Sequence, residues 1–426
     1  MSVLIGNKVS RTLVMAVFLV GITLGVALAG QQGQVYQVGN VTVYTAASQD
    51  MEGAGTIDFE NAKPMPLPMA LSAPQILRGG AAAMPLGAPG FKPGSRGNST
   101  SPRDTAVGNE AQAWGPAIPQ GMAVGVETQA GGIPVPQEYG TSDHPFTTSR
   151  VDLATNNSVS KLYPYRAAGK LFFNKPDGSA WLCSASLIQP GLIVTAAHCV
   201  CDFGTQTFYS NWQFIPAYYN GARPYGIWKV ADAVVKTSYW DGTDSCAQSG
   251  VVCTNDVAVL LVQPLGKAGP NNKSYPGYRT GWLGYGWDGY GFSSPSSGPA
   301  SGYTIAQIGQ LGYPVSHDRG WMMQRTDSLG YVSAPDSNNT VWGSRQTGGS
   351  SGGPEIVNLG APAVLDPNQT NFGSGADFNI VVGVTSWGYT DPTIMQQGAS
   401  SFTSNNIVSL VDYFCPSTTY AYACAP

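Results

Sequence analysis

The sequence is poor in charge and in histidine. Only 11% of its 426 residues are charged, and the formal net charge is −4. The sequence has no stripe of basic residues of the kind that binds nucleic acid, and no block of acidic residues of the kind that forms a solvating tail. Histidine, the usual general base near neutral pH, occurs three times, at His144, His198 and His317. His144 and His317 stand in irregular or polar stretches, so we assign a chemical role to neither.

Long hydrophobic runs are scarce as well. A single apolar stretch, residues 13–26, follows Lys8 and Arg11 and precedes the small residues ALA at 27–29. This pattern is typical of a secretory signal peptide, here residues 1–29. A membrane anchor is the alternative, but the stretch is short for a bilayer span and no second one of spanning length follows. We expect a secreted, extracellular protein with no membrane contact after signal cleavage.

Cysteine is absent before Cys183, and seven occur in all. Disulfides are typical of exported proteins, so this distribution agrees with secretion. No pair of cysteines and histidines has the spacing of a zinc site. We therefore expect neither a metal nor a cofactor.

Residues 30–150 lack sustained periodicity and are rich in Pro, Gly, Ala and Met, as in KPMPLP at 63–68. Such composition predicts a mostly irregular region, with room for a short strand near 35–44. We interpret the region as a propeptide that keeps a zymogen restrained until it is removed. The alternative is a permanent spacer. Cleavage after Arg150 would begin the mature chain at Val151.

From residue 151 onward the pattern changes to short apolar runs separated by turn residues. The 54 glycines and 21 tyrosines suit strands and turns better than helices, which predicts an all-β sandwich or barrel. A short helix is expected at 406–414. The expected strands are residues 171–173, 181–187, 192–195, 212–215, 230–235, 256–262, 281–283, 304–309, 322–326, 354–357 and 380–384.

The most informative stretch is TGGSSGGP at 347–354, where glycines flank a serine. Glycine permits backbone angles that other residues avoid, so such a turn can present Ser351 and aim backbone N–H groups at one point. Without other motifs, this glycine-rich stretch would be interpreted as an ordinary flexible linker. Two upstream stretches supply partners: TAAHC at 195–199 contains His198, and NDVAVL at 255–260 opens on Asp256.

These three stretches, in this order, resemble the chymotrypsin-like serine peptidases. TSWG at 385–388 resembles the family segment that pairs with the substrate backbone. The resemblance covers residues 153–414. It implies two six-stranded antiparallel β-barrels within a peptidase domain at 151–426. The barrels are expected at about 151–270 and 271–403, with a short helix and tail at 404–426.

The resemblance also implies the roles of individual residues. His198, Asp256 and Ser351 would form the catalytic triad, and the N–H groups of Gly349 and Ser351 the oxyanion hole. The implied protein is a monomeric endopeptidase acting on proteins or peptides. A secreted binding or adhesion module without activity, or an esterase, is the rival interpretation. The expected substrate-binding residues are Arg345, Thr385, Ser386, Trp387 and Gly388.

Less specific matches resemble the glutamyl endopeptidase-like subgroup: YPY at 163–165, CSAS at 183–186 and GYP at 312–314. Arg345 lies six residues before Ser351, at the family's pocket base, and could recognise an acidic P1 side chain. Alternatively, it faces solvent on a loop. Thr385 stands where that subgroup has histidine, so the P1 preference stays open. Ser350 replaces the aspartate that pairs with the new amino terminus in trypsin-like members.

The same resemblance implies that Cys183 pairs with Cys199 beside the catalytic histidine. Two further pairs would close small loops, Cys246 with Cys253 and Cys415 with Cys424. This leaves Cys201 unpaired, and we interpret it as a buried, inert thiol. Sequence alone does not establish the connectivity.

Overall fold

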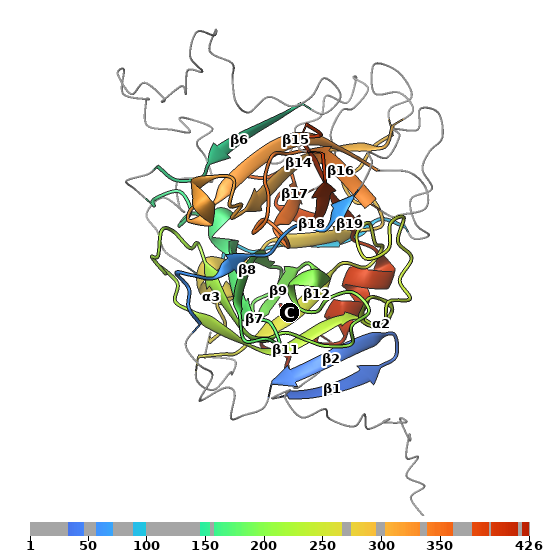
Figure 1. Cartoon of the computed structure of the whole chain (residues 1–426). Coiled ribbons are helices and arrows are strands. Elements are labelled where there is room, and N and C mark those ends of the chain that lie inside the picture. The colour runs from blue at the N-terminus through green and yellow to red at the C-terminus, as the bar shows by residue number, and fades with distance from the viewer. Residues whose placement is uncertain are drawn as a thin grey trace, which may run out of the picture.

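The structure is a computed structural model. It describes residues 33–46, 57–70, 88–98, 145–153, 157–265, 274–294, 303–332, 339–360, 377–391, 393–415 and 420–425. The predicted signal peptide and His144 lie outside the described residues. Two antiparallel β-barrels dominate what is described, one drawn mainly in green and the other in orange in Figure 1.

The first barrel closes through six strands in the order β11-β10-β7-β8-β9-β12, with β12 pairing back onto β11. All six pairings are antiparallel. The strands are β7 (Ala168–Asn174), β8 (Ala180–Leu187), β9 (Leu192–Thr195), β10 (Ser210–Pro216), β11 (Trp228–Lys236) and β12 (Ala258–Val262).

The second barrel closes in the same way, in the order β17-β14-β15-β16-β19-β18, with β17 pairing onto β18. Its pairings are also antiparallel. The strands are β14 (Ile305–Gly312), β15 (Gln324–Val332), β16 (Asn339–Gly343), β17 (Pro354–Val357), β18 (Ile380–Tyr389) and β19 (Gln396–Ser401). The predicted fold class, two six-stranded barrels, is confirmed.

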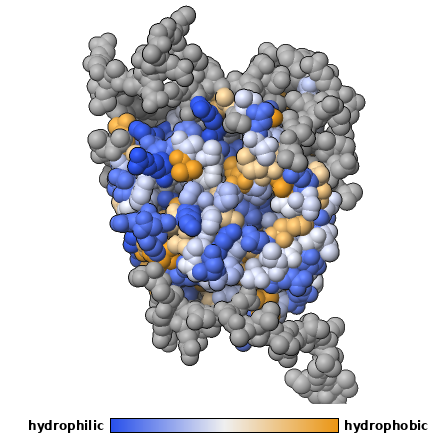
Figure 2. Space-filling model, in the orientation of Figure 1, coloured by the Kyte–Doolittle hydropathy of each residue, from blue (hydrophilic) through white to orange (hydrophobic). Residues whose placement is uncertain are grey.

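Burial explains why some strands are continuously apolar. Every residue of β9 and β12 is buried, because these neighbouring strands face the barrel interior on one side and other parts of the chain on the other. β11 instead alternates near its start, which is typical of a strand with one face outward. The face drawn in Figure 2 mixes hydrophilic and hydrophobic residues without a continuous apolar patch.

The helices are few and short. α2 covers Thr237–Asp241, α3 covers Gly277–Thr280, and single 3₁₀ turns lie at η1 (Tyr165–Ala167), η2 (Ala197–Cys199) and η3 (Asp318–Gly320). The predicted C-terminal helix is present as η4 (Ser404–Val408) followed by α4 (Ser409–Asp412). Within the described residues, no helix is long and apolar enough to cross a membrane.

The N-terminal region is less irregular than expected where it is described. It contributes β1 (Gly33–Val38), β2 (Val41–Ala46), β3 (Lys63–Pro64), β4 (Met69–Ala70), β5 (Gly90–Lys92) and β6 (Phe146–Arg150). β1 and β2 form a hairpin that pairs with β11 of the first barrel. β5 pairs with β13 (Gly284–Trp287), a strand that begins three residues later than the one we expected at 281–283.

The cysteine pairing agrees with the one implied by the family resemblance. Disulfides join Cys183 to Cys199, Cys246 to Cys253 and Cys415 to Cys424. Cys201 is free and buried. Burial, with the charge of Asp256 adding to it, raises the pKa of the Cys201 thiol well above its ordinary value, which disfavours the reactive thiolate.

Candidate active site

The pairing of β9 with β12 brings His198 and Asp256 together. Its register sets Ala258 opposite Thr195, so residues just before Ala258 meet residues just after Thr195. His198 lies there on the 3₁₀ turn η2. Its Nδ1 is 2.7 Å from Asp256 Oδ2, and its backbone N–H donates to Oδ1 at 2.8 Å. The carboxylate therefore holds both the ring and the backbone of His198.

Asp256 is almost completely buried and is surrounded by donors. Burial alone would raise the pKa of its carboxyl, but the His198 ring and hydrogen bonds from His198 and Ser386 hold that pKa below its ordinary value. Ser386 Oγ donates to Oδ2, and Ser400 Oγ accepts a hydrogen bond from the Asp256 backbone N–H at 3.0 Å. Asp256 is thus an ionised group fixed from both barrels.

Ser351 lies on the turn that precedes β17 of the second barrel, where it faces the first. Its carbonyl accepts a hydrogen bond from the N–H of Ser184 on β8 at 2.7 Å. Gly352, with φ of +76°, permits this contact, because a Cβ there would lie 1.9 Å from Thr195 Oγ1. The glycine therefore allows the serine turn to dock directly against the β8–β9 region.

Ser351 and His198 are close in the fold without being joined. Ser351 Oγ and His198 Nε2 are both buried, and neither has a hydrogen-bond partner among the described residues. Catalytic hydrogen bonds are often long in structures without substrate and tighten when it binds. The structure thus brings a base–carboxylate pair to the region of the serine but does not form the serine–histidine bond.

Gly349 directs its N–H toward the N-terminal region of the chain. Its φ is +92°, and a Cβ would lie 2.6 Å from the Tyr313 carbonyl oxygen. The carbonyl of Gly349 accepts from Ser184 Oγ at 2.8 Å, which fixes the orientation of the turn. Its N–H donates to the carbonyl of Met65, from the N-terminal region, at 2.9 Å. This amide therefore already binds a carbonyl oxygen, which the N-terminal region supplies.

The expected substrate-binding residues lie in two environments. Thr385, Ser386, Trp387 and Gly388 are buried on β18. Thr385 Oγ1 accepts from the buried Gln310 side chain at 2.8 Å, at the position where the glutamyl subgroup has histidine. Trp387 Nε1 donates to Asn339 Oδ1 at 2.7 Å.

Arg345, in contrast, is exposed. Its carbonyl accepts from Ser316 Oγ at 3.3 Å. Its role at the pocket base stays a prediction. Ser350 is buried, and its hydroxyl donates to the Thr347 carbonyl at 2.7 Å within the same turn.

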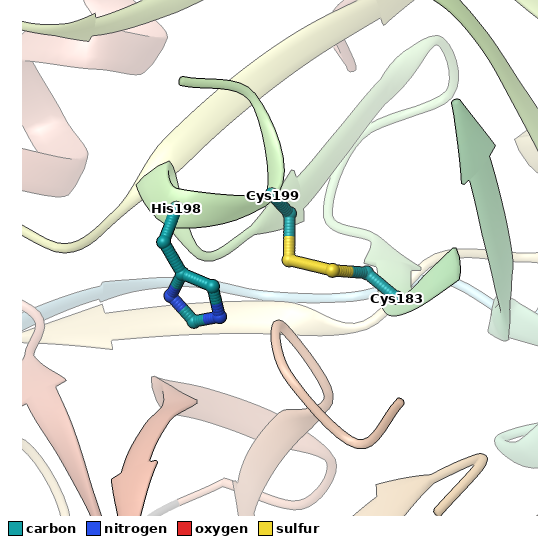
Figure 3. Close-up of side chains that lie close together, drawn as sticks. All are labelled: Cys183, His198 and Cys199. Carbon is teal, nitrogen blue, oxygen red and sulfur yellow. A yellow bond between two sulfur atoms is a disulfide. The ribbon is translucent and has the colours of Figure 1, made fainter. Parts of the chain in front are cut away.

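A disulfide lies beside the histidine. Figure 3 shows Cys199 on the same short helix as His198 and the Cys183–Cys199 bond alongside the ring. The ligand atoms of these three residues lie within 4.8 Å of one another, but both sulfurs belong to the disulfide. They are therefore not thiolate ligands, and the bond instead ties η2 to β8.

Sequence analysis missed Ser184 and Ser400, which position this site. Ser184 donates to Gly349, and its Oγ also accepts from the Tyr313 N–H at 3.0 Å. Ser400 connects Asp256 to the Cys253 carbonyl, to which it donates at 2.7 Å. The only available signal for Ser184 was its place in the motif CSAS at 183–186. Ser400 lies in a polar stretch that no motif marks.

Two closed barrels that meet at this histidine, carboxylate and serine define the chymotrypsin-like class of fold. The family model described as Trypsin matches residues 155–273, a segment that includes His198 and Asp256 and ends before Ser351.

Among curated proteins, no relative matches. Among solved structures, similar chains include the protease Anisep from Arthrobacter nicotinovorans, with 19% identity and a TM-score of 0.41, covering 61% of this chain and 95% of that one. A Glu endopeptidase in complex with MPD has 19% identity and a TM-score of 0.41, covering 65% and 97%. The thermostable serine protease AL20 from an extremophilic microorganism has 21% identity and a TM-score of 0.40, covering 58% and 96%.

Proposed function

We propose that this chain is a secreted serine endopeptidase that hydrolyses peptide bonds through His198, Asp256 and Ser351. The observation that carries the proposal is the hydrogen-bonded His198–Asp256 pair in the first barrel, facing a glycine-flanked serine turn from the second. Histidine needs such a carboxylate to hold its tautomer and to stabilise its charged form. The trypsin family match over the first barrel supports the same chemistry.

In this mechanism, Ser351 Oγ attacks the scissile carbonyl carbon while His198 Nε2 takes the hydroxyl proton. Asp256 stabilises the resulting imidazolium without taking its proton. The C–N bond then breaks as His198 returns the proton to the leaving amine, and an acyl-enzyme remains on Ser351. Water, deprotonated by His198, attacks the acyl group and restores the serine.

Negative charge on the tetrahedral intermediate falls on an oxygen near the Gly349 N–H. The Ser351 N–H is the second proposed donor. Each such donor contributes about 3–4 kcal/mol to stabilising the transition state. The Ser184 hydrogen bond to the Gly349 carbonyl supports the oxyanion hole by holding the peptide that carries the amide.

Secretion and specificity are parts of the proposal. The signal pattern at residues 1–29 and the three disulfides support export. The proposed substrate has an acidic side chain at P1, which Arg345 would recognise. A peptide-library cleavage profile tests that preference, and strong cutting after lysine would refute it.

Casein hydrolysis and fluorophosphonate labelling test the activity. Processed wild type, freed of residues 1–150, should label on Ser351 and cut casein, and the same form of Ser351→Ala should do neither. Ser350→Ala is the matched control, because its hydroxyl bonds only within the turn in the described contacts. The alternative, a binding or adhesion module, would be favoured if no form of the chain, processed or not, labels.

A further inference from the structure

A segment of the N-terminal region crosses the junction of the two barrels, directly over the candidate active site. Residues 57–70, which we name the strap, pair in parallel with β8 of the first barrel through β3 and with β18 of the second through β4. Blue strands of the N-terminal region accordingly lie between the green and orange barrels in Figure 1. The strap is therefore a single connection across the cleft.

The strap uses the backbone groups that a peptide substrate would need. The Met65 carbonyl occupies the Gly349 N–H, and the Pro68 carbonyl occupies the N–H of Gly388. Both donors belong to segments expected to bind substrate. The backbone bonds are Met65 N–H to the Leu182 carbonyl at 2.9 Å, Gly349 N–H to Met65 at 2.9 Å, Gly388 N–H to Pro68 at 3.0 Å and Thr390 N–H to Ala70 at 3.0 Å.

The strap's side chains alternate between buried and exposed at residues 65–67. Met65 and Leu67 are buried, at 5% and 7% exposure, whereas Pro66 between them is exposed. Met65 belongs to the main hydrophobic cluster, and Leu67 Cδ1 lies 3.5 Å from the position of a Cβ on Gly388. These contacts bury Met65 and Leu67 against the barrels, and Ser351, two residues after Gly349, is completely buried.

The prolines explain why this segment can lie there. Residues 64, 66 and 68 are all proline, which favours an extended chain and leaves these three residues without a backbone donor. Its carbonyls are consequently free to accept bonds from the cleft. A pre-extended segment also loses less conformational entropy on docking than a flexible one. The composition that predicted irregular structure thus suits residues 63–70, whose backbone partners on β8, β18 and the serine turn are distant in sequence.

We propose that the strap is an autoinhibitory element that keeps the full-length chain latent by occupying the oxyanion amide and the β18 edge. This inference rests on the proposed peptidase function, because a blocked cleft has this meaning only if Ser351 reacts. It identifies residues 57–70 as the restraining part of the region interpreted as a propeptide. Displacement of the strap then becomes the activating step.

The test compares rates of fluorophosphonate labelling of Ser351 in intact full-length chains, with intactness checked by mass. Met65→Asp and Leu67→Asp place a charge against the cleft, so each should label at least about tenfold faster than wild type. Met69→Asp is the matched control, because Met69 lies in the same strap at 43% exposure. It should label at the wild-type rate. A synthetic peptide of residues 57–70 should slow the labelling of Leu67→Asp again.

Leu67→Asp is the variant less exposed to misfolding, because Leu67 lies outside all three hydrophobic clusters, whereas Met65 belongs to the main one. Equal labelling rates for wild type and all three variants would refute the inhibitory role of the strap and would leave the peptidase proposal unaffected. If Ser351 labels in none of these chains, nor in a chain freed of residues 1–150, the peptidase proposal fails and the strap proposal fails with it.

Discussion

Ser386 and His198 bind the same oxygen of Asp256. The Ser386 hydroxyl, from the second barrel, donates to Oδ2, and His198 Nδ1 lies 2.7 Å from that atom within the first. The orientation of the carboxylate therefore depends on the docking of the two barrels. A change at their junction can reach the histidine without touching it.

Ser386→Ala should lower kcat about tenfold with little change in KM. Loss of the donor leaves a buried carboxylate oxygen with one partner fewer, which costs about 1–2 kcal/mol. The pKa of Asp256 should rise toward its ordinary value, because that hydrogen bond helps hold it down. Steady-state kinetics across pH measure both effects. Ser409→Ala, remote from the site, is the control, and equal kinetics for the two variants would contradict the assignment.

Gly352→Ala should abolish activity and destabilise the fold by about 3 kcal/mol or more. An added Cβ would meet Thr195 Oγ1 at 1.9 Å and the Ser184 carbonyl at 2.4 Å, in addition to the strain of a positive φ. Gly221→Ala isolates the backbone effect, because φ there is +85° with nothing within 4 Å of the new Cβ. That control should cost about 1–2 kcal/mol. Urea unfolding measures the free energy of unfolding of each variant. Similar losses in Gly352→Ala and Gly221→Ala would argue against close docking of the serine turn.

Replacement of both Cys183 and Cys199 by alanine should lower the free energy of unfolding by about 3 kcal/mol and reduce activity. The disulfide restricts the unfolded chain and ties the turn that carries His198 to β8. Cys201→Ala, which removes a buried thiol without breaking a cross-link, should cost about 1 kcal/mol. Denaturant midpoints with matched slopes give both values. A double variant as stable as Cys201→Ala would refute the expectation.

Glu355→Gln should stabilise the protein increasingly as pH rises. Glu355 is completely buried on β17, and neither carboxyl oxygen has a partner among the described residues. Burial raises the pKa of this carboxyl well above its ordinary value. The folded state thus keeps a proton that the unfolded state releases above about pH 4.3. Its contribution to stability is present below that pH and is lost as pH rises.

The variant should therefore gain stability over wild type progressively between pH 4 and pH 8. Thermal unfolding at several pH values measures the difference. Glu60→Gln, on an exposed residue, should follow the wild-type curve at every pH. A pH-independent gain in Glu355→Gln would mean that proton release is not its source.

Much of the barrel architecture could be predicted from sequence because its strands are apolar and bounded by turns. The bounds expected for residues 192–195 and 354–357 coincide with β9 and β17. β19 was missed, because its sequence QQGASS lacks the apolar residues that mark a strand. There Gly398 lies against the Trp387 ring, so the partner strand supplies the bulk that β19 lacks.

The strap and the Ser184 contacts could not be predicted for a different reason. The local sequence pattern predicts the backbone conformation of a segment but not its distant contacts. Met65 and Gly349 are hydrogen-bonded although they lie far apart in the chain. Prolines at 64, 66 and 68 exclude regular structure formed within the segment, and they say nothing about a docking site elsewhere. His198, Asp256 and Ser351 could be proposed as site residues from the sequence only because each lies within a recognisable motif.

The β1–β2 hairpin bears on solubility. Residues 232–236 of β11 pair with β2, at positions beyond the short stretch where β11 pairs with β10. Without the hairpin, this part of β11 would present unpaired backbone groups beside buried Ala233, Val234 and Val235. Such an open edge is a template for pairing with another chain. A chain trimmed to begin at Val151 would thus gain a self-association risk that the longer chain does not carry.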